Sequence, residues 1–150
     1  MGAKNVAAKK TIRDQALDKV VAVIRVRGRV NVRSDIAETL TRLRLKRVNN
    51  CIILKLSSSY KGMLNKCVNH VAYGEVDEPT LEKLVLKKGE GLNAKELFTG
   101  KYDPIKLKEF MPFRLHPPRH GYRSTKLSFK QGGSLGYMGD AINKLLNRMV

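Results

Sequence analysis

The sequence predicts a mixed fold of the α+β class, with a compact core that runs strand, helix, strand, helix, strand. Three short runs rich in β-branched or alternating apolar residues begin near positions 21, 51 and 71. Two stretches with apolar residues at helical spacing separate these runs. Such a unit is expected to close near Val76 and to pack its two helices on one face of a small sheet. The other face and the loops at the sheet ends would then be exposed.

The first half of the core follows from two patterns. A strand is expected over residues 21–27 (VAVIRVR), where alternate apolar residues face one way and Arg25 and Arg27 face the other. Arg25 is therefore expected on an exposed sheet face. Ser34 is then expected to cap a helix over 34–45 that has one apolar stripe, acidic residues in its first turn and basic residues near its end.

The second half of the core repeats this order. A strand is expected over 51–57 (CIILKLS), with alternate apolar residues facing inward. A helix over about 60–69 follows, and Cys67 lies on its apolar stripe. A shorter strand over 71–76 completes the core.

Beyond the core, the sequence predicts an extension that is partly helical and partly extended. Pro79 starts a helix that ends at Gly89. Two short helices follow over 92–99 and 104–111, and a helix over 141–149 closes the chain. The expected parts of the chain are a basic N-terminal tail (1–19), the core (20–77) and the extension (78–150).

The composition indicates a polyanionic partner. The chain has 30 Lys and Arg against 13 Asp and Glu, a net charge of +17 over 150 residues, and a pI of about 10.2. Such self-repulsion is best explained by a polyanion that neutralises it. Aromatic content is only 6% with no Trp, which argues against a stacking platform for single-stranded bases. The two cysteines make no disulfide scaffold, which favours a reducing compartment.

The most informative segment is residues 113–137 (FRLHPPRHGYRSTKLSFKQGGSLGY), which we call the basic ribbon. It has five Lys and Arg, two histidines and no acidic residue. Its apolar residues are too scattered for a helix or strand face, so we expect it to contribute little to the core and to order on structured RNA. Its His116, Tyr122 and Phe129 are candidates either to stack on bases or to pack on the core.

Enzymatic interpretations have less support. Cys67 and His70 are three residues apart, as in a thiol nucleophile and its base, but the position of Cys67 on an apolar stripe favours a buried structural thiol. His116 and His120 resemble the acid–base pair of an RNA-processing nuclease, but no third group is present to orient them. No set of Cys and His has metal-ligand spacing.

Several motifs stand out in order along the chain: Arg27-Gly28, the run Leu40–Leu45 into Lys46-Arg47, Lys61-Gly62-Met63, and the final GGSLGYMGDAINKLLNRM. With these motifs, the sequence from Val20 onward resembles the large-subunit ribosomal protein family called L-thirty in prokaryotes and L-seven in eukaryotes. The basic ribbon and the segment after it resemble the extension of the archaeal and eukaryotic forms, and the chain length favours an archaeal member.

The resemblance implies a β-α-β-α-β core with a three-stranded antiparallel sheet, akin to ferredoxin-like folds. It also implies a structural, non-catalytic component of the large ribosomal subunit that binds large-subunit rRNA next to neighbouring large-subunit ribosomal proteins. We expect no cofactor, no metal, no membrane and no small-molecule substrate. The expected location is the ribosome in the cytoplasm.

The expected rRNA contacts lie on the loops at the sheet ends, at the start of the second helix and along the basic ribbon. Lys61 and Gly62 are expected where free backbone N–H groups at a helix N-terminus favour a phosphate. By contrast, Arg42 and Arg44 are interpreted as ordinary helix-end charges. The candidate RNA-binding residues are Arg27, Arg29, Arg33, Lys46, Arg47, Lys61, Gly62, Arg114, His116, Arg119, Arg123, Lys126 and Lys130.

A free-standing RNA-binding protein, such as an assembly factor or RNA chaperone, is the main alternative. It would present the same basic surface without a permanent place in the ribosome. A nuclease is the further alternative. Composition alone does not separate these functions.

Overall fold

The structure is a computed structural model that describes residues 19–89, 91–102, 107 and 109–150. The predicted N-terminal tail lies outside the described residues apart from Lys19. The helix predicted over 104–111 is described only at residues 107 and 109–111, of which 107, 109 and 110 are helical and Met111 is not.

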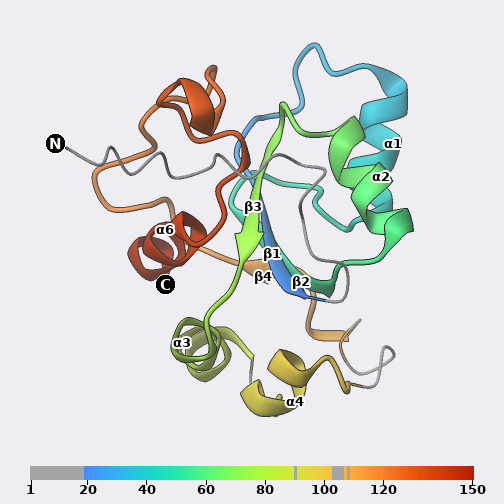
Figure 1. Ribbon diagram of the computed structural model, residues 1–150. Helices are drawn as coiled ribbons and strands as arrows, with labels where there is room; N and C mark the ends of the chain where they lie inside the picture. Colours follow the sequence, from blue (N-terminus) through green and yellow to red (C-terminus); the bar gives the residue numbers. More distant parts are fainter. Residues whose placement is uncertain (1–18, 90, 103–106, 108) are drawn as a thin grey trace, which may run out of the picture.

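The centre of the molecule is an antiparallel unit of three strands, β1 (Val20–Arg25), β2 (Asn50–Lys55) and β3 (Val71–Glu75). β1 lies between the other two and pairs antiparallel with both. The connections contain α1 (Ser34–Arg42) and α2 (Ser58–Lys66). The predicted mixed α+β class and the element order of the core are therefore confirmed (Figure 1).

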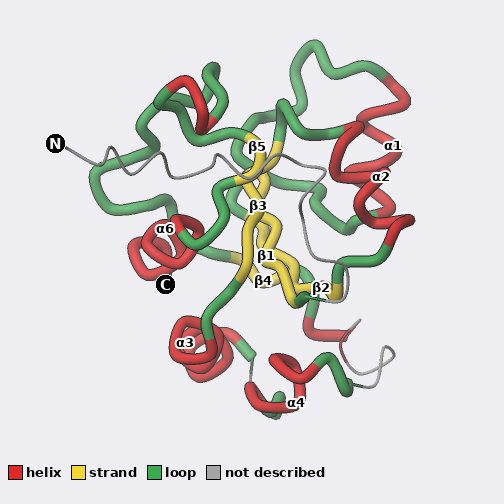
Figure 2. The backbone as a smooth tube through the Cα atoms, in the orientation of Figure 1, coloured by secondary structure: helices red, strands yellow, loops and turns green. Residues whose placement is uncertain are grey.

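The sheet has five strands and not the three predicted. The two ends of the basic ribbon each add a strand of two residues, β4 (Phe113–Arg114) and β5 (Gly136–Tyr137). β4 pairs antiparallel with β2 and β5 pairs parallel with β3, which gives the order β4-β2-β1-β3-β5. Figure 2 shows the strands in yellow at the centre of the molecule. Such short strands leave no alternating pattern in a sequence, because alternation needs about four residues.

The two faces of the sheet are both covered, so the prediction of a free far face was wrong. The helices α1 and α2 cover one face. The other face packs against α3 (Glu78–Lys88), α4 (Ala94–Thr99) and α6 (Ala141–Met149). All six residues of β1 are buried, as expected for a strand that has helices on both faces.

The helix ends agree with the predictions within a few residues. Ser57 accepts a hydrogen bond from the Tyr60 N–H and caps α2. In α1, by contrast, Ser34 is the first helical residue, and Arg33 occupies the cap position with no side-chain cap hydrogen bond. Gly89 follows α3, and α6 has the bounds that its apolar spacing predicted.

The basic ribbon contributes to the core at both ends, against the prediction. Phe113 is 1% exposed and Leu135 is 3% exposed, and both belong to the cluster under α3 and α6. Between these ends, residues 124–135 fold back on themselves: the Phe129 N–H donates to the Leu135 carbonyl at 2.8 Å and the Gly133 N–H donates to the Ser128 carbonyl at 2.8 Å. The ribbon is thus held to the sheet by backbone pairing, which its side-chain pattern did not reveal.

Candidate nucleic-acid interface

One end of the sheet gathers three segments that are distant in sequence. In the pairing of β1 with β2, Ile24 lies opposite Cys51, and in the pairing of β2 with β4, Cys51 lies opposite Phe113. Three segments therefore meet the sheet at the same end. They are the loop after β1 (26–33), the turn before β2 (44–49) and the ribbon after β4. We call this end of the sheet the basic end.

A pocket at the basic end brings three of the predicted residues together. It has a volume of about 530 Å³, and its described lining includes four cationic side chains and no carboxylate. The three predicted residues are Lys46, Arg47 and Arg114. The pocket brings them together although the first two are 67 residues or more from the third along the chain. The lining residues are Thr41, Arg44, Lys46, Arg47, Asn50, Met111, Pro112 and Arg114.

Arg44 is the cation among the described lining residues of this pocket that was not predicted from the sequence. It was assigned to the end of the helix, but α1 ends at Arg42 and Arg44 has a φ of 60° in the turn that follows. Its neighbours Leu43 and Leu45 are buried while Arg44 is exposed. A cation between two apolar residues was the signal that could have placed it outside the helix. Arg42 fits the original interpretation, since it donates to Glu38 Oε1 at 2.6 Å on the helix surface.

The loop over 26–33 adds a second group of cations. Arg27, Arg29 and Arg33 are all exposed, as predicted for residues of a loop. Arg33 forms an ion pair with Asp35 at 3.5 Å, so part of its charge is already balanced. Val30 at the loop tip is 86% exposed, and it is the one exposed valine of this loop, among the arginines.

The ribbon is tied to the turn over 44–49 by Tyr122. Its hydroxyl donates to Asn49 Oδ1 at 2.7 Å, and burial raises the pKa of Tyr122 to about 12. Tyr122 also packs on the core cluster under α6. Of the two roles considered for this side chain, the structure therefore supports packing.

The remaining predicted residues of the ribbon are exposed. The His116 N–H donates to the Met149 carbonyl and the Arg119 N–H donates to the Arg148 carbonyl, so both lie beside the end of α6. Arg123 follows Tyr122, and Lys126 and Lys130 lie on the folded segment 124–135. The exposed predicted residues of the ribbon are Arg114, His116, Arg119, Arg123, Lys126 and Lys130.

Lys61 and Gly62 do not join the basic end, and their predicted position at a helix start is wrong. α2 begins three residues earlier, at Ser58, and the Lys61 N–H already donates to the Ser57 carbonyl at 2.9 Å. Gly62 lines a groove between α1 and α2 whose lining includes Asp35 and Glu38. Two features expected of a phosphate site are therefore not found at these described residues: the Lys61 N–H is already bonded, and Gly62 lies in a groove that has carboxylates.

The thiol is a structural group. Cys67 is buried, its Sγ lies 3.2 Å from the Met63 carbonyl, and burial raises the pKa of Cys67 to about 11. The prediction of a buried thiol is confirmed. A thiol with such a pKa is protonated at neutral pH and is a poor nucleophile.

Among the described residues, no group of three His, Cys, Asp or Glu is placed to hold a metal ion. Within the same part of the chain, no helix has the length and apolar character to span a membrane.

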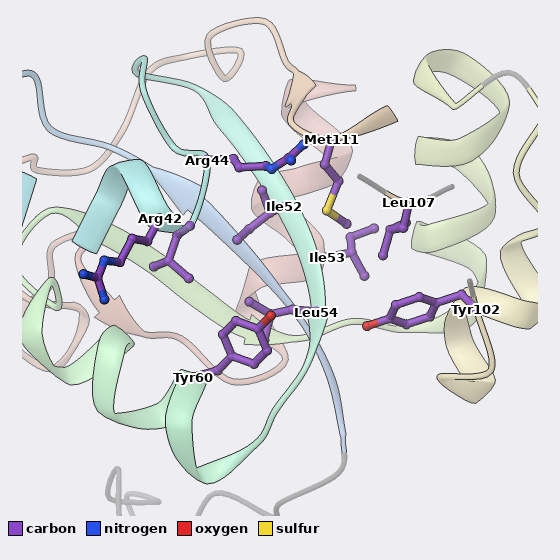
Figure 3. Close-up of a pocket in the computed structure, with 10 residues that line it drawn as sticks. Arg42, Arg44, Ile52, Ile53, Leu54, Tyr60, Tyr102, Leu107 and Met111 are labelled. Atoms are coloured by element: carbon purple, nitrogen blue, oxygen red, sulfur yellow. The ribbon is translucent and has the colours of Figure 1, made fainter. Parts of the chain in front are cut away.

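An apolar pocket lies beside the basic one at the edge of β2 (Figure 3). Its volume is about 170 Å³, and it shares Arg44 and Met111 with the basic pocket. Its other described lining residues are aliphatic or tyrosine side chains and Arg42, without His, Cys or a carboxylate. This lining supplies packing surface rather than an acid–base pair.

Comparison with known proteins gives concordant matches. The family described as ribosomal protein L30p/L7e matches residues 21–71. The large ribosomal subunit protein uL30 of Methanococcus vannielii is 44% identical over 151 aligned positions, which cover 86% of this chain and 98% of that protein. The proteins of the same name from Thermoplasma acidophilum and Methanosphaera stadtmanae are each 37% identical, and the alignments cover 87% and 86% of this chain and 93% and 99% of theirs.

Proposed function

The chain belongs to the ribosomal protein L30p/L7e family, and from this premise we propose that it is a structural component of the large ribosomal subunit. In this role it binds and orders large-subunit rRNA with its basic end and lies against neighbouring large-subunit ribosomal proteins. It performs no reaction, and its place of work is the ribosome. Its relatives are named as large ribosomal subunit proteins, and the alignments cover nearly their whole lengths, which supports this role.

The observation that carries the proposal is the basic pocket. Four cations converge on one cavity without a carboxylate among its described lining residues. Arg is suited to phosphate because its planar guanidinium can donate two parallel hydrogen bonds, and Lys adds a mobile point charge. A phosphate in the pocket would therefore meet charge from the turn over 44–49 and from β4 at once. Both parts of the chain, the core over 20–77 and the extension over 78–150, contribute to the site.

The surrounding cations extend this contact. Arg27 and Arg29 continue the surface from the loop over 26–33, and the exposed cations of the basic ribbon continue it on the other side. Most of these contacts are to phosphate and ribose, so the protein recognises the shape of a folded RNA more than its sequence. Lys61 and Gly62 lie apart from this surface, and a contact there requires a separate strand of RNA.

The test is binding of the full chain to large-subunit rRNA fragments over a salt series. Deleting residues 113–137 is unsuitable because it removes β4 and β5 from the sheet. We therefore compare the wild type with the triple variant Arg44→Gln, Lys46→Gln, Arg47→Gln. Each lost phosphate contact is expected to lower the slope of log affinity against log salt by roughly 0.7–0.9. An unchanged slope in the triple variant contradicts the proposed site.

The family role is tested separately, by sedimentation of the protein with large subunits. A structural component remains with mature subunits through a high-salt wash. An assembly factor is expected instead on precursor particles and to be absent from washed mature subunits. That second outcome contradicts the proposed role and leaves RNA binding intact.

A further inference from the structure

Arg25 occupies a position that its place in the sequence did not predict. It is the last residue of β1, and it was expected on an exposed face of the sheet. In the structure it is 4% exposed. Its guanidinium lies between the loop over 26–33 and the turn over 44–49, the two segments that carry most cations of the basic end.

The hydrogen bonds of Arg25 reach both segments. On the loop side, Nε donates to the Arg27 carbonyl at 2.9 Å and Nη2 donates to the Gly28 carbonyl at 3.1 Å. On the turn side, Nη1 donates to the Leu45 carbonyl at 2.7 Å and to the Lys46 carbonyl at 3.3 Å. One side chain therefore bonds to four carbonyl oxygens in two segments that are about 20 residues apart.

The backbone of Arg25 strengthens the same connection. Its carbonyl accepts from the Asn49 N–H at 2.8 Å, and the N–H groups of Val26 and Arg27 both donate to the His70 carbonyl. Side chain and main chain thus fix the loop, the turn and the start of β3 to one another. The Arg27 and Lys46 carbonyls accept from the same guanidinium, so the backbone positions of these two residues are held relative to one another.

Among the described residues, the hydrogen-bond partners of the Arg25 guanidinium are carbonyl oxygens. No ion pair joins it to an acidic group of the described residues. Burial, followed by the nearby charge of Arg29, lowers the pKa of Arg25 from its ordinary value. The guanidinium nevertheless remains charged at neutral pH, because arginine does not deprotonate in proteins. Its positive charge therefore adds to the electrostatic potential of the exposed cations on the loop over 26–33 and the turn over 44–49.

We propose that Arg25 is the positioning residue of the RNA surface: its buried guanidinium holds the two basic loops at the spacing that phosphates of folded rRNA require. This rests on the proposed function, since it names the group that organises the same site. The four carbonyl oxygens accept hydrogen bonds from a cation, which offsets their repulsion of a nearby phosphate. Preorganisation of this kind improves affinity because the loops lose little freedom on binding.

The test replaces the guanidinium and keeps the charge. Lysine has one ammonium group, which does not span four carbonyls in two loops, so Arg25→Lys separates geometry from charge. The matched control is Arg42→Lys, the same change at an exposed helix residue. We expect Arg25→Lys to weaken rRNA binding about tenfold and to lower the salt slope by roughly 1, whereas Arg42→Lys changes affinity less than about twofold.

The readouts separate positioning from general stability. Both variants are measured well below their unfolding temperatures, where a loss of stability alone leaves the affinity and the slope unchanged. We also expect a double-variant cycle to show coupling: in an Arg47→Gln background, Arg25→Lys costs less affinity than it does alone. A folded Arg25→Lys with wild-type affinity and slope, or additive effects in the cycle, would overturn the proposal.

Two further outcomes are distinguishable. If the wild type binds rRNA without salt dependence, the proposed function fails, independently of Arg25. If Arg25→Lys does not fold, the wild type provides the test through the NMR signal of the Arg25 Nε–H. A slowly exchanging, protected Nε–H supports the network of hydrogen bonds, and exchange at the rate of a free side chain contradicts it.

Discussion

The two ends of the sheet differ in how their charges are balanced. At the basic end, the segments 26–33, 44–49 and 113–123 have nine Lys and Arg and no acidic residue. At the opposite end, α3, α4 and the connection between them (78–99) have four Glu and four Lys. Figure 1 shows the loop after β1 at the top of the molecule and α3 with α4 at the bottom.

The difference in charge supports the proposal that the basic end is the surface that contacts a polyanion. The ion pairs among the described residues include one at the basic end, between Arg33 and Asp35. Residues 78–99 at the other end have Glu and Lys in equal number, so the formal net charge of this segment is zero. The excess of +17 for the whole chain therefore lies outside residues 78–99. An RNA surface requires cations that the protein itself has not neutralised.

The largest expected effect comes from removing charge at one end or the other. The variant Lys46→Gln, Arg47→Gln, Arg114→Gln is expected to weaken rRNA binding on the order of a hundredfold at near-physiological salt. The control Lys83→Gln, Lys88→Gln, Lys95→Gln removes the same charge from α3 and α4, and we expect less than a threefold change. Filter binding measures both. Equal losses would show that net charge alone governs binding and that neither end is a specific site.

A smaller effect is expected from distorting the ribbon. A Cβ on Gly133 would overlap the Leu127 carbonyl, so Gly133→Ala forces the segment 124–135 to rearrange. We expect a loss of about 2 kcal/mol or more in unfolding free energy, and a fall in rRNA affinity of roughly three- to tenfold through Lys126 and Lys130. Thermal unfolding and binding titrations measure the two quantities.

Gly62→Ala is the control for this substitution. A Cβ there meets nothing within 4 Å, and Gly62 lies inside α2, so we expect a gain of about 0.5–1 kcal/mol in unfolding free energy. Its rRNA affinity is expected to remain that of the wild type. A large loss of affinity would show that RNA closely approaches α2 and would extend the interface beyond the basic end.

Tyr122→Phe is expected to act more weakly. It removes the hydrogen bond from the Tyr122 hydroxyl to Asn49 Oδ1, which joins the ribbon to the turn over 44–49. We expect a loss of about 1 kcal/mol in unfolding free energy and a two- to threefold loss of affinity. Tyr60→Phe, at an exposed position on α2, is expected to change neither. Identical results for both variants would contradict the claim that the Tyr122 hydroxyl holds the ribbon to the turn over 44–49.

The smallest expected effect is a pH dependence of stability from His70. Burial, Arg27 and Arg25 lower the pKa of His70 from its ordinary value of 6.5. The unfolded chain therefore binds a proton more readily, so stability is greatest above about pH 6.5 and falls as the pH drops through that value. It levels off once the pH is below the folded pKa. His70→Gln is expected to reduce this slope in urea titrations, and an unchanged slope would contradict the assignment.

The local elements of the fold were predictable from the sequence. The helix over 141–149 has four apolar residues at helical spacing, and the structure gives it those same bounds. The core strands were located within two residues because each is a short run of β-branched or alternating apolar residues between turn residues. The family resemblance is also confirmed by relatives that align along most of the chain.

The failures concern contacts between distant segments. Arg25 was placed on an exposed face because alternation along β1 does not reveal that carbonyls from two loops surround its side chain. The two-residue strands of the ribbon were missed because their stability comes from pairing with β2 and β3 rather than from their own residues. Arg44 was missed because the helix ends two residues before it.

The central claim is that the basic end, and not the α3–α4 end, contacts rRNA. Ultraviolet crosslinking of the bound complex, followed by mass spectrometry of the crosslinked peptides, tests it most directly. We predict crosslinks in peptides that cover residues 26–33, 44–49 and 113–130, and almost none in peptides that cover 78–99. Crosslinks concentrated in residues 78–99 would contradict the account.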